Sequence, residues 1–253
     1  MPSIPPDGEP APLDGALPPS ALIDASDRPL ALYVHVPFCS SRCGYCDFNT
    51  YTPAELSISN DLKETSTSYT DLLIRELDFA RNTSGEAKVP TIFFGGGTPT
   101  FFSPENLKAL VGAVLKDAIV HPEHEFSFEG HPNNTTFEHL KTLYDLGFTR
   151  VSYGVQDSNL EVQTVINRIQ PQENVERVVL WAREIGYDSV NLDLVYGLPL
   201  QDLKKIEKTI SDALTIKPDR IAFYSYAHVP WTSKAQRLFD ENDLPSTSLK
   251  MQI

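Results

Sequence analysis

The sequence predicts an α/β fold, a partial (β/α)6 TIM-like barrel rather than a closed barrel of eight units. Two observations lead to this prediction. Six short apolar runs recur along the 253-residue chain, and a stretch with helical periodicity separates each run from the next. Strands that are apolar almost throughout are typical of a parallel sheet covered by helices. A doubly wound open sheet is the alternative.

The elements follow one another in regular order. The six expected strands are the runs 31–36, 91–94, 125–129, 149–155, 188–196 and 219–226. Helices are expected at 69–81, 104–118, 135–146, 158–166, 172–185 and 202–215, with a further helical pattern at 234–240. The clearest helix start is Ser103-Pro104, because serine is a favoured N-cap and proline suits the first helical position. Residues 50–68 are expected to form a polar insertion.

Two segments flank the predicted barrel core, which spans residues 29–230. Residues 1–28 are predicted to be a disordered, proline-rich leader, because seven of the first 20 residues are proline and few could build a core. Residues 231–253 are interpreted as the start of a truncated C-terminal region, since the chain stops where another helix begins. We therefore expect a fragment of a longer protein, with its C-terminal domain missing.

Charge and hydropathy limit the possible partners. Thirty-four acidic residues against 21 basic ones give a formal net charge of −13, and no lysine or arginine cluster offsets it. Nucleic acid is therefore not expected as a partner. No run reaches the ~20 apolar residues that a membrane helix needs, and the N-terminus lacks the features of a secretory signal. We expect a cytoplasmic protein without a membrane span.

All three cysteines lie within eight residues, as Cys39-x3-Cys43-x2-Cys46, after the first expected strand. An odd, clustered set is a poor disulfide framework and favours metal or cluster ligation in a reducing compartment. Three thiolates can ligate three irons of a [4Fe–4S] cluster, whereas an ordinary electron-transfer cluster uses four. The open fourth iron can chelate S-adenosylmethionine (SAM), and an electron from the reduced cluster would then cleave the S–C5′ bond.

Two other interpretations of the cysteines remain open. One is a zinc site completed by His35, and the other is a set of buried structural cysteines. Zinc ligands usually come as two separated pairs, and the sequence has no second pair. His35 falls in the middle of the first expected strand, where we expect a packed residue or one that supports the ligands.

A glycine run, Gly95-Gly-Gly-Thr98-Pro-Thr100, follows the second expected strand. The missing side chains would let backbone groups approach a ligand closely, and Thr98 adds a hydroxyl. The run matches neither the GxGxxG dinucleotide motif nor a phosphate loop. Because Cys39 and this run follow predicted strands and Glu129 ends one, we expect them at the same end of the barrel.

Together these motifs resemble the radical SAM superfamily. The residues around them resemble its oxygen-independent coproporphyrinogen III dehydrogenase (oxidase) family, which includes related haem chaperones. The similar segments are 33–39 (YVHVPFC), 95–100 (GGGTPT), 151–157 (VSYGVQD), 166–168 (INR) and 191–199 (NLDLVYGLP). The resemblance covers residues 31–250. It implies a partial barrel of six β/α units that binds a [4Fe–4S] cluster through its three cysteines and takes SAM as a second cofactor.

The resemblance also implies which residues contact SAM. Carried over position by position, they are Tyr33, Gly96, Gly97, Thr98, Glu129, Gln156, Arg168, Asp193 and Ala227. Glu129 would accept hydrogen bonds from the methionine ammonium, and Arg168 would pair with its carboxylate through two bonds. Asp193 would suit the ribose hydroxyls. No catalytic residue beyond the cluster and SAM is implied.

Two functions are compatible with the resemblance. Residues 120–250 resemble the dehydrogenase, which converts coproporphyrinogen III to protoporphyrinogen IX and takes electrons from a donor such as flavodoxin or ferredoxin. Residues 1–60 resemble the haem chaperone, which binds and transfers haem, and Phe48 stands where the dehydrogenase has a fourth cysteine. We favour the enzyme because its matching stretch is longer. The chaperone is the alternative, and a non-functional fragment is the third possibility.

Overall fold

The computed structural model describes residues 31–56, 62–84, 88–116 and 118–253. Six parallel strands form one sheet in the order β1-β2-β3-β4-β5-β6. They are β1 (Ala31–Val36), β2 (Lys88–Gly96), β3 (Ile119–Gly130), β4 (Arg150–Gln156), β5 (Ser189–Tyr196) and β6 (Arg220–Ser225). Each strand pairs with the next one in sequence and the order never reverses. The predicted partial barrel is therefore confirmed, and the doubly wound alternative is wrong.

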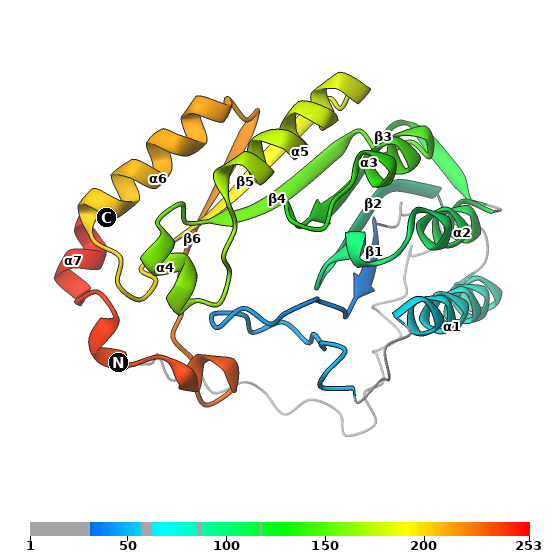
Figure 1. Cartoon of the computed structure of the whole chain (residues 1–253). Coiled ribbons are helices and arrows are strands. Elements are labelled where there is room, and N and C mark those ends of the chain that lie inside the picture. The colour runs from blue at the N-terminus through cyan, green and yellow to red at the C-terminus, as the bar shows by residue number, and fades with distance from the viewer. Residues whose placement is uncertain (1–30, 57–61, 85–87, 117) are drawn as a thin grey trace, which may run out of the picture.

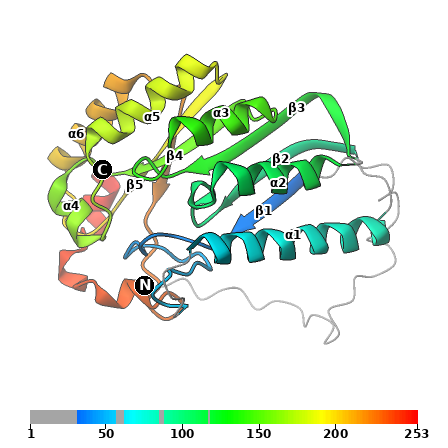
Figure 2. The same cartoon turned by 45° about the vertical axis from the view of Figure 1, so that its right-hand side comes forward.

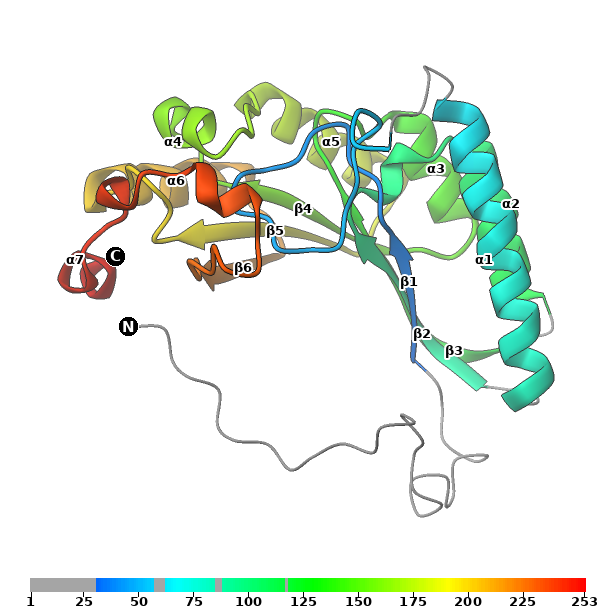
Figure 3. The ribbon, with the colours of Figure 1, turned by 90° about the horizontal axis from the view of Figure 1, so that it is seen from below.

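Helices α1 to α6 connect the strands and lie along the outer side of the curved sheet (Figures 1 and 3). They are α1 (Leu62–Ser84), α2 (Pro104–Leu115), α3 (Phe137–Asp145), α4 (Leu160–Val165), α5 (Gln172–Ile185) and α6 (Leu203–Ile216). A terminal helix, α7 (Thr247–Gln252), confirms the helix that was expected to begin near the chain's end. Three 3-10 helices complete the described elements: η3 (Pro99–Phe101), η4 (Ala235–Leu238) and η5 (Glu241–Asp243).

The main core lies between the sheet and these helices. Phe148 is fully buried, and its ring centroid lies 5.3 Å from that of Phe94 on β2 and 5.6 Å from that of Phe126 on β3. Buried aromatic rings remove a large apolar area from water, so they contribute strongly to stability. This packed layer stabilises the sheet, and because all neighbouring strands are parallel, their carboxyl ends lie at one edge.

Several predicted elements differ from the structure. The polar insertion at 50–68 is too long, because α1 begins at Leu62. The first turns of α1 are polar and show no apolar period, but they continue a helix whose later residues Leu73 and Leu77 pack on the core.

Strands β2 and β3 extend beyond their predicted ranges, because Lys88 and Val89 pair with mostly exposed residues of β3. The pattern at 234–240 is the 3-10 helix η4.

The structure describes only one of the two flanking segments. The leader predicted at 1–28 lies outside the described residues. The segment after β6, residues 226–244, folds back beside the loop that follows β1 (Figure 2). We call residues 226–244 the C-terminal strap and residues 37–51 the cysteine loop. None of the described helices combines the length and the apolar character that crossing a membrane requires.

Candidate functional site

A cavity of about 700 Å³ lies where the six strands end. Its lining includes nearly all of the residues predicted from the sequence: Cys39, Cys43, Cys46, Gly96, Gly97, Thr98, Glu129, Gln156, Arg168, Asp193 and Ala227. The carboxyl ends of parallel strands in β/α barrels carry the loops that bind ligands. The fold thus brings together residues that are widely separated in sequence, as predicted for this edge.

The cysteine loop is fastened to the glycine run beside it. Cys39 donates its backbone N–H to Tyr51 O at 3.1 Å, which closes the loop on itself. Thr98 donates its backbone N–H to Phe38 O at 2.8 Å, and its hydroxyl donates to Cys39 Sγ at 3.7 Å. These bonds hold the first thiol against the end of β2. The two sequence motifs therefore form one unit in space.

The three cysteines are free thiols, each partly buried. Burial raises the pKa of the Cys46 thiol to about 11, and burial is also the main reason that the pKa of Cys39 lies above its ordinary value. Such thiols stay protonated until a metal replaces the proton. No group of three or more His, Cys, Asp or Glu side chains in the described part of the chain is arranged around a single ion. An iron–sulfur cluster does not require its ligands to surround a single ion, because each thiolate binds its own iron.

The glycine run is required by packing within the protein. Gly96 has a φ of +106°, and a Cβ there would lie 2.5 Å from His35 Nδ1. A Cβ on Gly97 would lie 2.6 Å from Phe38 O. The predicted reason for these glycines, close approach of a ligand, is thus incomplete. The missing side chains first allow the end of β2 to lie against β1 and the cysteine loop.

His35 supports the cysteine loop. Its Nε2 lies 3.0 Å from Asn49 O, and its Nδ1 lies 3.2 Å from the Tyr33 hydroxyl, so both ring nitrogens have partners within the protein. This arrangement agrees with a supporting residue and does not favour a zinc site completed by His35. Tyr33 stacks on Phe93 with ring centroids 5.9 Å apart and is half exposed. Of the predicted SAM contacts, Tyr33 alone falls outside the described lining of the cavity.

Two carboxyl groups line the cavity from β3 and β5. Glu129 Oε2 accepts the backbone N–H of Gly96 at 3.2 Å. Burial, followed by the negative charge of Asp193, raises the pKa of Glu129 to about 7. Asp193 accepts hydrogen bonds from Ser152 at 2.9 Å and Asn191 at 2.7 Å, and burial raises its pKa as well. A carboxyl group that titrates near neutrality in a cavity is typical of a functional site.

Arg168 brings a positive charge to the same cavity. Its Nη2 donates to Gly154 O at 2.6 Å, and its Nη1 donates to Cys43 Sγ at 3.4 Å. Its Nε is buried and has no hydrogen-bond partner among the described residues. An unpaired buried donor costs free energy, so this guanidinium favours the binding of an anion in the cavity.

Gln156 enters the cavity from an irregular end of β4. The pairing of β4 with β5 shifts between Gly154 and Gln156, and Gln156 has a φ of +67°. A Cβ on Gly154 would lie 2.5 Å from Gln156 Nε2 and 2.9 Å from Arg168 Nη2. The ends of the Gln156 and Arg168 side chains therefore both lie against Gly154, in space that a larger residue there would fill.

Several lining residues were missed from the sequence. Two of them, Tyr45 and His131, could have been found from the sequence, because they lie beside predicted site residues. Tyr45 lies between two of the cysteines, and His131 lies two residues beyond Glu129. Burial, with the nearby charge of Arg168, lowers the pKa of His131 to about 3, so its ring is neutral. Gln236 could not be found in this way, because it comes from the C-terminal strap.

The C-terminal strap is hydrogen-bonded to the cysteine loop. Gln236 is buried and donates to Tyr45 O at 3.0 Å, and Ser233 donates to Cys46 O at 2.8 Å. Both acceptors are backbone carbonyl groups of the cysteine triplet. Part of the segment that was interpreted as the start of a truncated region is therefore built into the site.

The comparison with protein families agrees with this geometry. Residues 33–213 match the family described as the radical SAM superfamily, a range that includes the three cysteines and every predicted SAM contact except Ala227. The chain belongs to the radical SAM superfamily. The resemblance inferred from the cysteine and glycine motifs is therefore confirmed.

This radical SAM chain also resembles proteins of known name. It is 42% identical to the oxygen-independent coproporphyrinogen III oxidase of Helicobacter pylori over 230 residues, which are 89% of this chain and 48% of the relative. The corresponding oxidase of Pseudomonas aeruginosa is 37% identical over 229 residues, with the same coverage. The chain thus spans about half the length of the curated relatives it matches. These relatives give the haem-chaperone alternative no specific support.

A solved structure shows the same arrangement of strands and helices. The coproporphyrinogen III oxidase of Escherichia coli, described as a radical SAM enzyme, matches with a TM-score of 0.84 at 33% identity. The match covers 94% of this chain and 54% of that one. The predicted fold class of the radical SAM type is therefore confirmed.

Membership of the radical SAM superfamily implies a [4Fe–4S] cluster and SAM as cofactors. The cavity suits these groups in its donor chemistry. Three thiols in one loop match a cluster with one open iron. The unpaired Nε of Arg168 and the carboxyl group of Glu129 match the two charges of an amino acid.

Proposed function

We propose that this chain is the cofactor-binding core of a radical SAM enzyme that converts coproporphyrinogen III to protoporphyrinogen IX without oxygen. The observation that carries the proposal is the convergence of three thiols, Arg168 and Glu129 on one cavity. The oxidase names of relatives at 37–42% identity supply the substrate. Because the chain spans about half of those relatives, the whole activity is assigned to the full-length protein.

In this proposal Cys39, Cys43 and Cys46 would hold the cluster, which would leave one iron without a protein ligand and free to bind SAM. When bound, the cluster and SAM supply one-electron cleavage of a carbon–sulfur bond, which is the chemistry of hydrogen-atom abstraction. The protein binds and orients these groups and excludes water from the cavity. The Thr98 hydroxyl, which donates to Cys39 Sγ, keeps the first thiol turned towards the cavity.

The polar residues of the cavity wall would hold SAM. Glu129 accepts hydrogen bonds from its ammonium, Arg168 pairs with its carboxylate, and Asp193 accepts from the ribose hydroxyls. Gln156, which ends beside Arg168, adds a neutral hydrogen-bonding group. The remaining proposed contacts are Tyr33, Gly96, Gly97, Thr98 and Ala227.

We also propose a cytoplasmic location and a small electron carrier, such as flavodoxin or ferredoxin, as the donor. Three free thiols that ligate iron need a reducing compartment. A cluster that acts by one-electron transfer needs an external reductant in each turnover. Purified carriers can be compared directly by the rate at which each one reduces the cluster.

The proposed activity can be tested on the full-length protein. Cluster-loaded enzyme is incubated without oxygen with SAM, a reductant and coproporphyrinogen III, and the products are separated by mass. Loss of carbon dioxide from two propionate groups and formation of two vinyl groups is expected. A cluster-loaded protein that binds SAM but forms no vinyl product would overturn the proposal. A parallel haem titration that gives a stoichiometric Soret shift would then favour the chaperone.

The affinity for SAM is expected to fall as the pH drops through about 7. Above this pH Glu129 is ionised and attracts the SAM ammonium, whereas below it the protonated acid has lost the charge, because its pKa is raised to about 7. From one pH unit above the pKa to one below, the ionised fraction falls roughly tenfold, so the affinity should fall about tenfold. Calorimetric titration at several pH values measures this. Glu129→Gln should give a flatter profile, and a flat wild-type profile would contradict the role of Glu129.

Replacing Gln236 with leucine is expected to speed loss of the cluster to a chelator about tenfold. The leucine cannot donate to Tyr45 O or accept from Val229 N–H, so two partly buried backbone groups lose their partner and the cysteine loop loosens. The decay of iron–sulfur absorbance in the presence of a chelator measures the rate. Lys234→Leu, at an exposed strap position, is the matched control and should decay like wild type. Equal rates for both variants and wild type would contradict a role for the strap.

A further inference from the structure

Asp157 follows Gln156 at the end of β4 and is completely buried, with an exposed fraction of 0%. Its Oδ1 accepts hydrogen bonds from Asn159 N–H at 2.6 Å and the Thr209 hydroxyl at 3.1 Å, and its Oδ2 accepts from Gln201 Nε2 at 2.6 Å. Among the described residues, no lysine or arginine forms an ion pair with this carboxylate. Lys205 favours the charged form from beyond ion-pair distance, and because burying a charge is costly, the hydrogen bonds of Asp157 must satisfy it.

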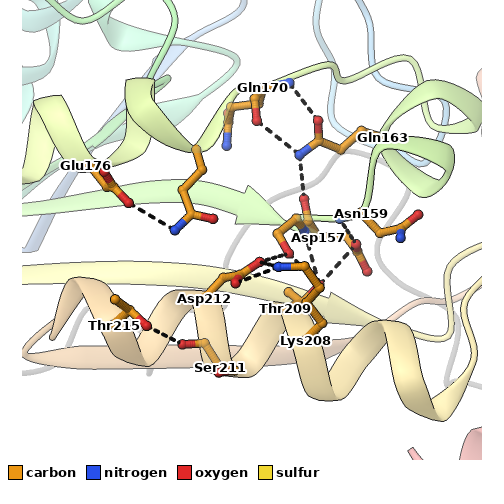
Figure 4. Close-up of polar contacts among 12 residues, drawn as sticks. Asp157, Asn159, Gln163, Gln170, Glu176, Lys208, Thr209, Ser211, Asp212 and Thr215 are labelled. Atoms are coloured by element: carbon orange, nitrogen blue, oxygen red, sulfur yellow. Dashed lines mark hydrogen bonds and ion pairs between the residues drawn. The ribbon is translucent and has the colours of Figure 1, made fainter.

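The three donors come from different elements around the end of β4, and Figure 4 shows two of them, Asn159 and Thr209. Asn159 is the N-cap of α4, and Thr209 lies within α6. Gln201 lies in the loop between β5 and α6, where it also donates to Val195 O at 2.9 Å. A single carboxylate therefore ties the end of β4 to α4, to α6 and to the end of β5.

The residue before Asp157 needs such support. Gln156 has a φ of +67°, in the left-handed region that residues with a side chain rarely adopt. The shifted pairing of β4 with β5 leaves Val155 as an extra residue, and irregularities of this kind turn the following side chain in a new direction. Backbone of this type persists only where the surroundings hold it from several sides. The hydrogen bonds of Asp157 fix the backbone directly after Gln156 in this way.

A second link runs from Asp157 to the segment that carries Arg168. The buried Gln163 amide donates to Asp157 O at 2.8 Å and to Gln170 O at 3.0 Å, and it accepts Gln170 N–H at 2.9 Å (Figure 4). Arg168 donates its own backbone N–H to Gln163 O at 2.8 Å. Gln163 thus bonds the segment at Arg168 through its backbone carbonyl and at Gln170 through its amide, and the same amide joins the segment to the backbone of Asp157.

We infer that Asp157 is a positioning residue that sets the directions of Gln156 and Arg168 in the cavity. It is absent from the described lining of the cavity, so it acts through these two neighbours. The residue type fits the task, because an ionised carboxylate accepts from all three donors, whereas an amide would turn an N–H towards one of them. The inference rests on the proposed function, in which Gln156 and Arg168 contact SAM.

The test compares Asp157→Asn with a matched control, Asp212→Asn. Asp212 belongs to the same polar region and accepts from Ser158 at 2.6 Å and Lys208 at 2.8 Å, but it forms no hydrogen bond with Asp157 (Figure 4). Thr209→Val is a milder second variant that removes one donor to Asp157 at nearly constant volume. SAM affinity and iron content are measured on the cluster-loaded proteins. Hydrogen–deuterium exchange is measured on the cluster-free proteins, at a temperature where all are folded.

Asp157→Asn is expected to bind SAM about tenfold more weakly than wild type, with unchanged iron content. Thr209→Val should lose about threefold, and Asp212→Asn should stay within about twofold. In the cluster-free proteins, Asp157→Asn should speed exchange in residues 154–157 and 166–170 and leave residues 39–46 unchanged. A merely stabilising residue would not produce this selective pattern at a temperature where every variant is folded.

The inference is overturned if folded, iron-loaded Asp157→Asn binds SAM like wild type, or if Asp212→Asn is weakened as much. If Asp157→Asn does not fold, Thr209→Val decides: unchanged affinity and exchange in this variant would overturn the inference. If wild type itself binds no SAM, the proposed function has failed. The exchange pattern then decides the positioning role, which is rejected if residues 154–157 and 166–170 keep their wild-type rates.

Discussion

Replacing Cys43 with alanine is expected to leave the protein unable to hold its [4Fe–4S] cluster. Each of the three thiols is proposed to bind a separate iron, so the loss of one leaves two irons of the cube without a protein ligand. Substitutions that only remove the support of a metal ligand already cost 10–100-fold in metal affinity. We therefore expect iron content after anaerobic reconstitution to fall by at least about tenfold. Cys39→Ala and Cys46→Ala should behave in the same way.

Phe48→Ala provides the matched control for the cysteine variants. Phe48 lines the same cavity from the same loop and is exposed, but it offers no ligand for iron. This variant should retain wild-type iron and sulfide. Any single cysteine variant that kept a full cluster would show that the three thiols do not each bind an iron, and the site would have to be reassigned.

The second large effect is expected at Arg168. Replacing it with glutamine removes the positive charge that is proposed to pair with the SAM carboxylate. A bidentate, charge-assisted interaction of this kind contributes about 2.7 kcal/mol, which corresponds to about 100-fold in affinity. Arg168→Lys keeps the charge but loses the planar fork, so its affinity should lie between those of wild type and Arg168→Gln. Equilibrium binding of SAM to cluster-loaded protein measures all three.

Arg183→Gln is the control for this series. Arg183 is an exposed arginine on α5 that is absent from the described cavity lining and donates to the backbone carbonyl of Ile216 at 3.0 Å. Its replacement should leave SAM affinity unchanged. Because Arg168 also donates to Cys43 Sγ, iron content must be measured beside affinity. A folded, iron-loaded Arg168→Gln protein with wild-type affinity would contradict the proposed role.

Much of the fold could be predicted because each element leaves a local pattern. Helix α5 has the predicted bounds, since an amphipathic period records which face is buried. The start of α1 and the ends of β2 and β3 could not be predicted in the same way. Residues 62–68 and much of β3 are polar or exposed, and their conformation follows from the longer element that contains them.

The candidate site shows the same division. The cysteines, Gly96 and Glu129 lie close to strand ends, so the order of elements predicts that they meet. Gln236 and Asp157 could not be found this way, because their importance comes from hydrogen bonds to residues distant in the sequence. The glycines illustrate a third case: their position was predicted, but the main physical reason for them is contact with His35 and Phe38.

Electron paramagnetic resonance of the reduced, cluster-loaded protein, recorded before and after addition of SAM, tests the central claim most directly. A cluster held by three thiolates has one iron free to bind SAM, so the spectrum of a reduced [4Fe–4S] cluster should appear and should change when SAM is added. A protein that forms no such cluster, or one whose spectrum is the same with and without SAM, would contradict this account.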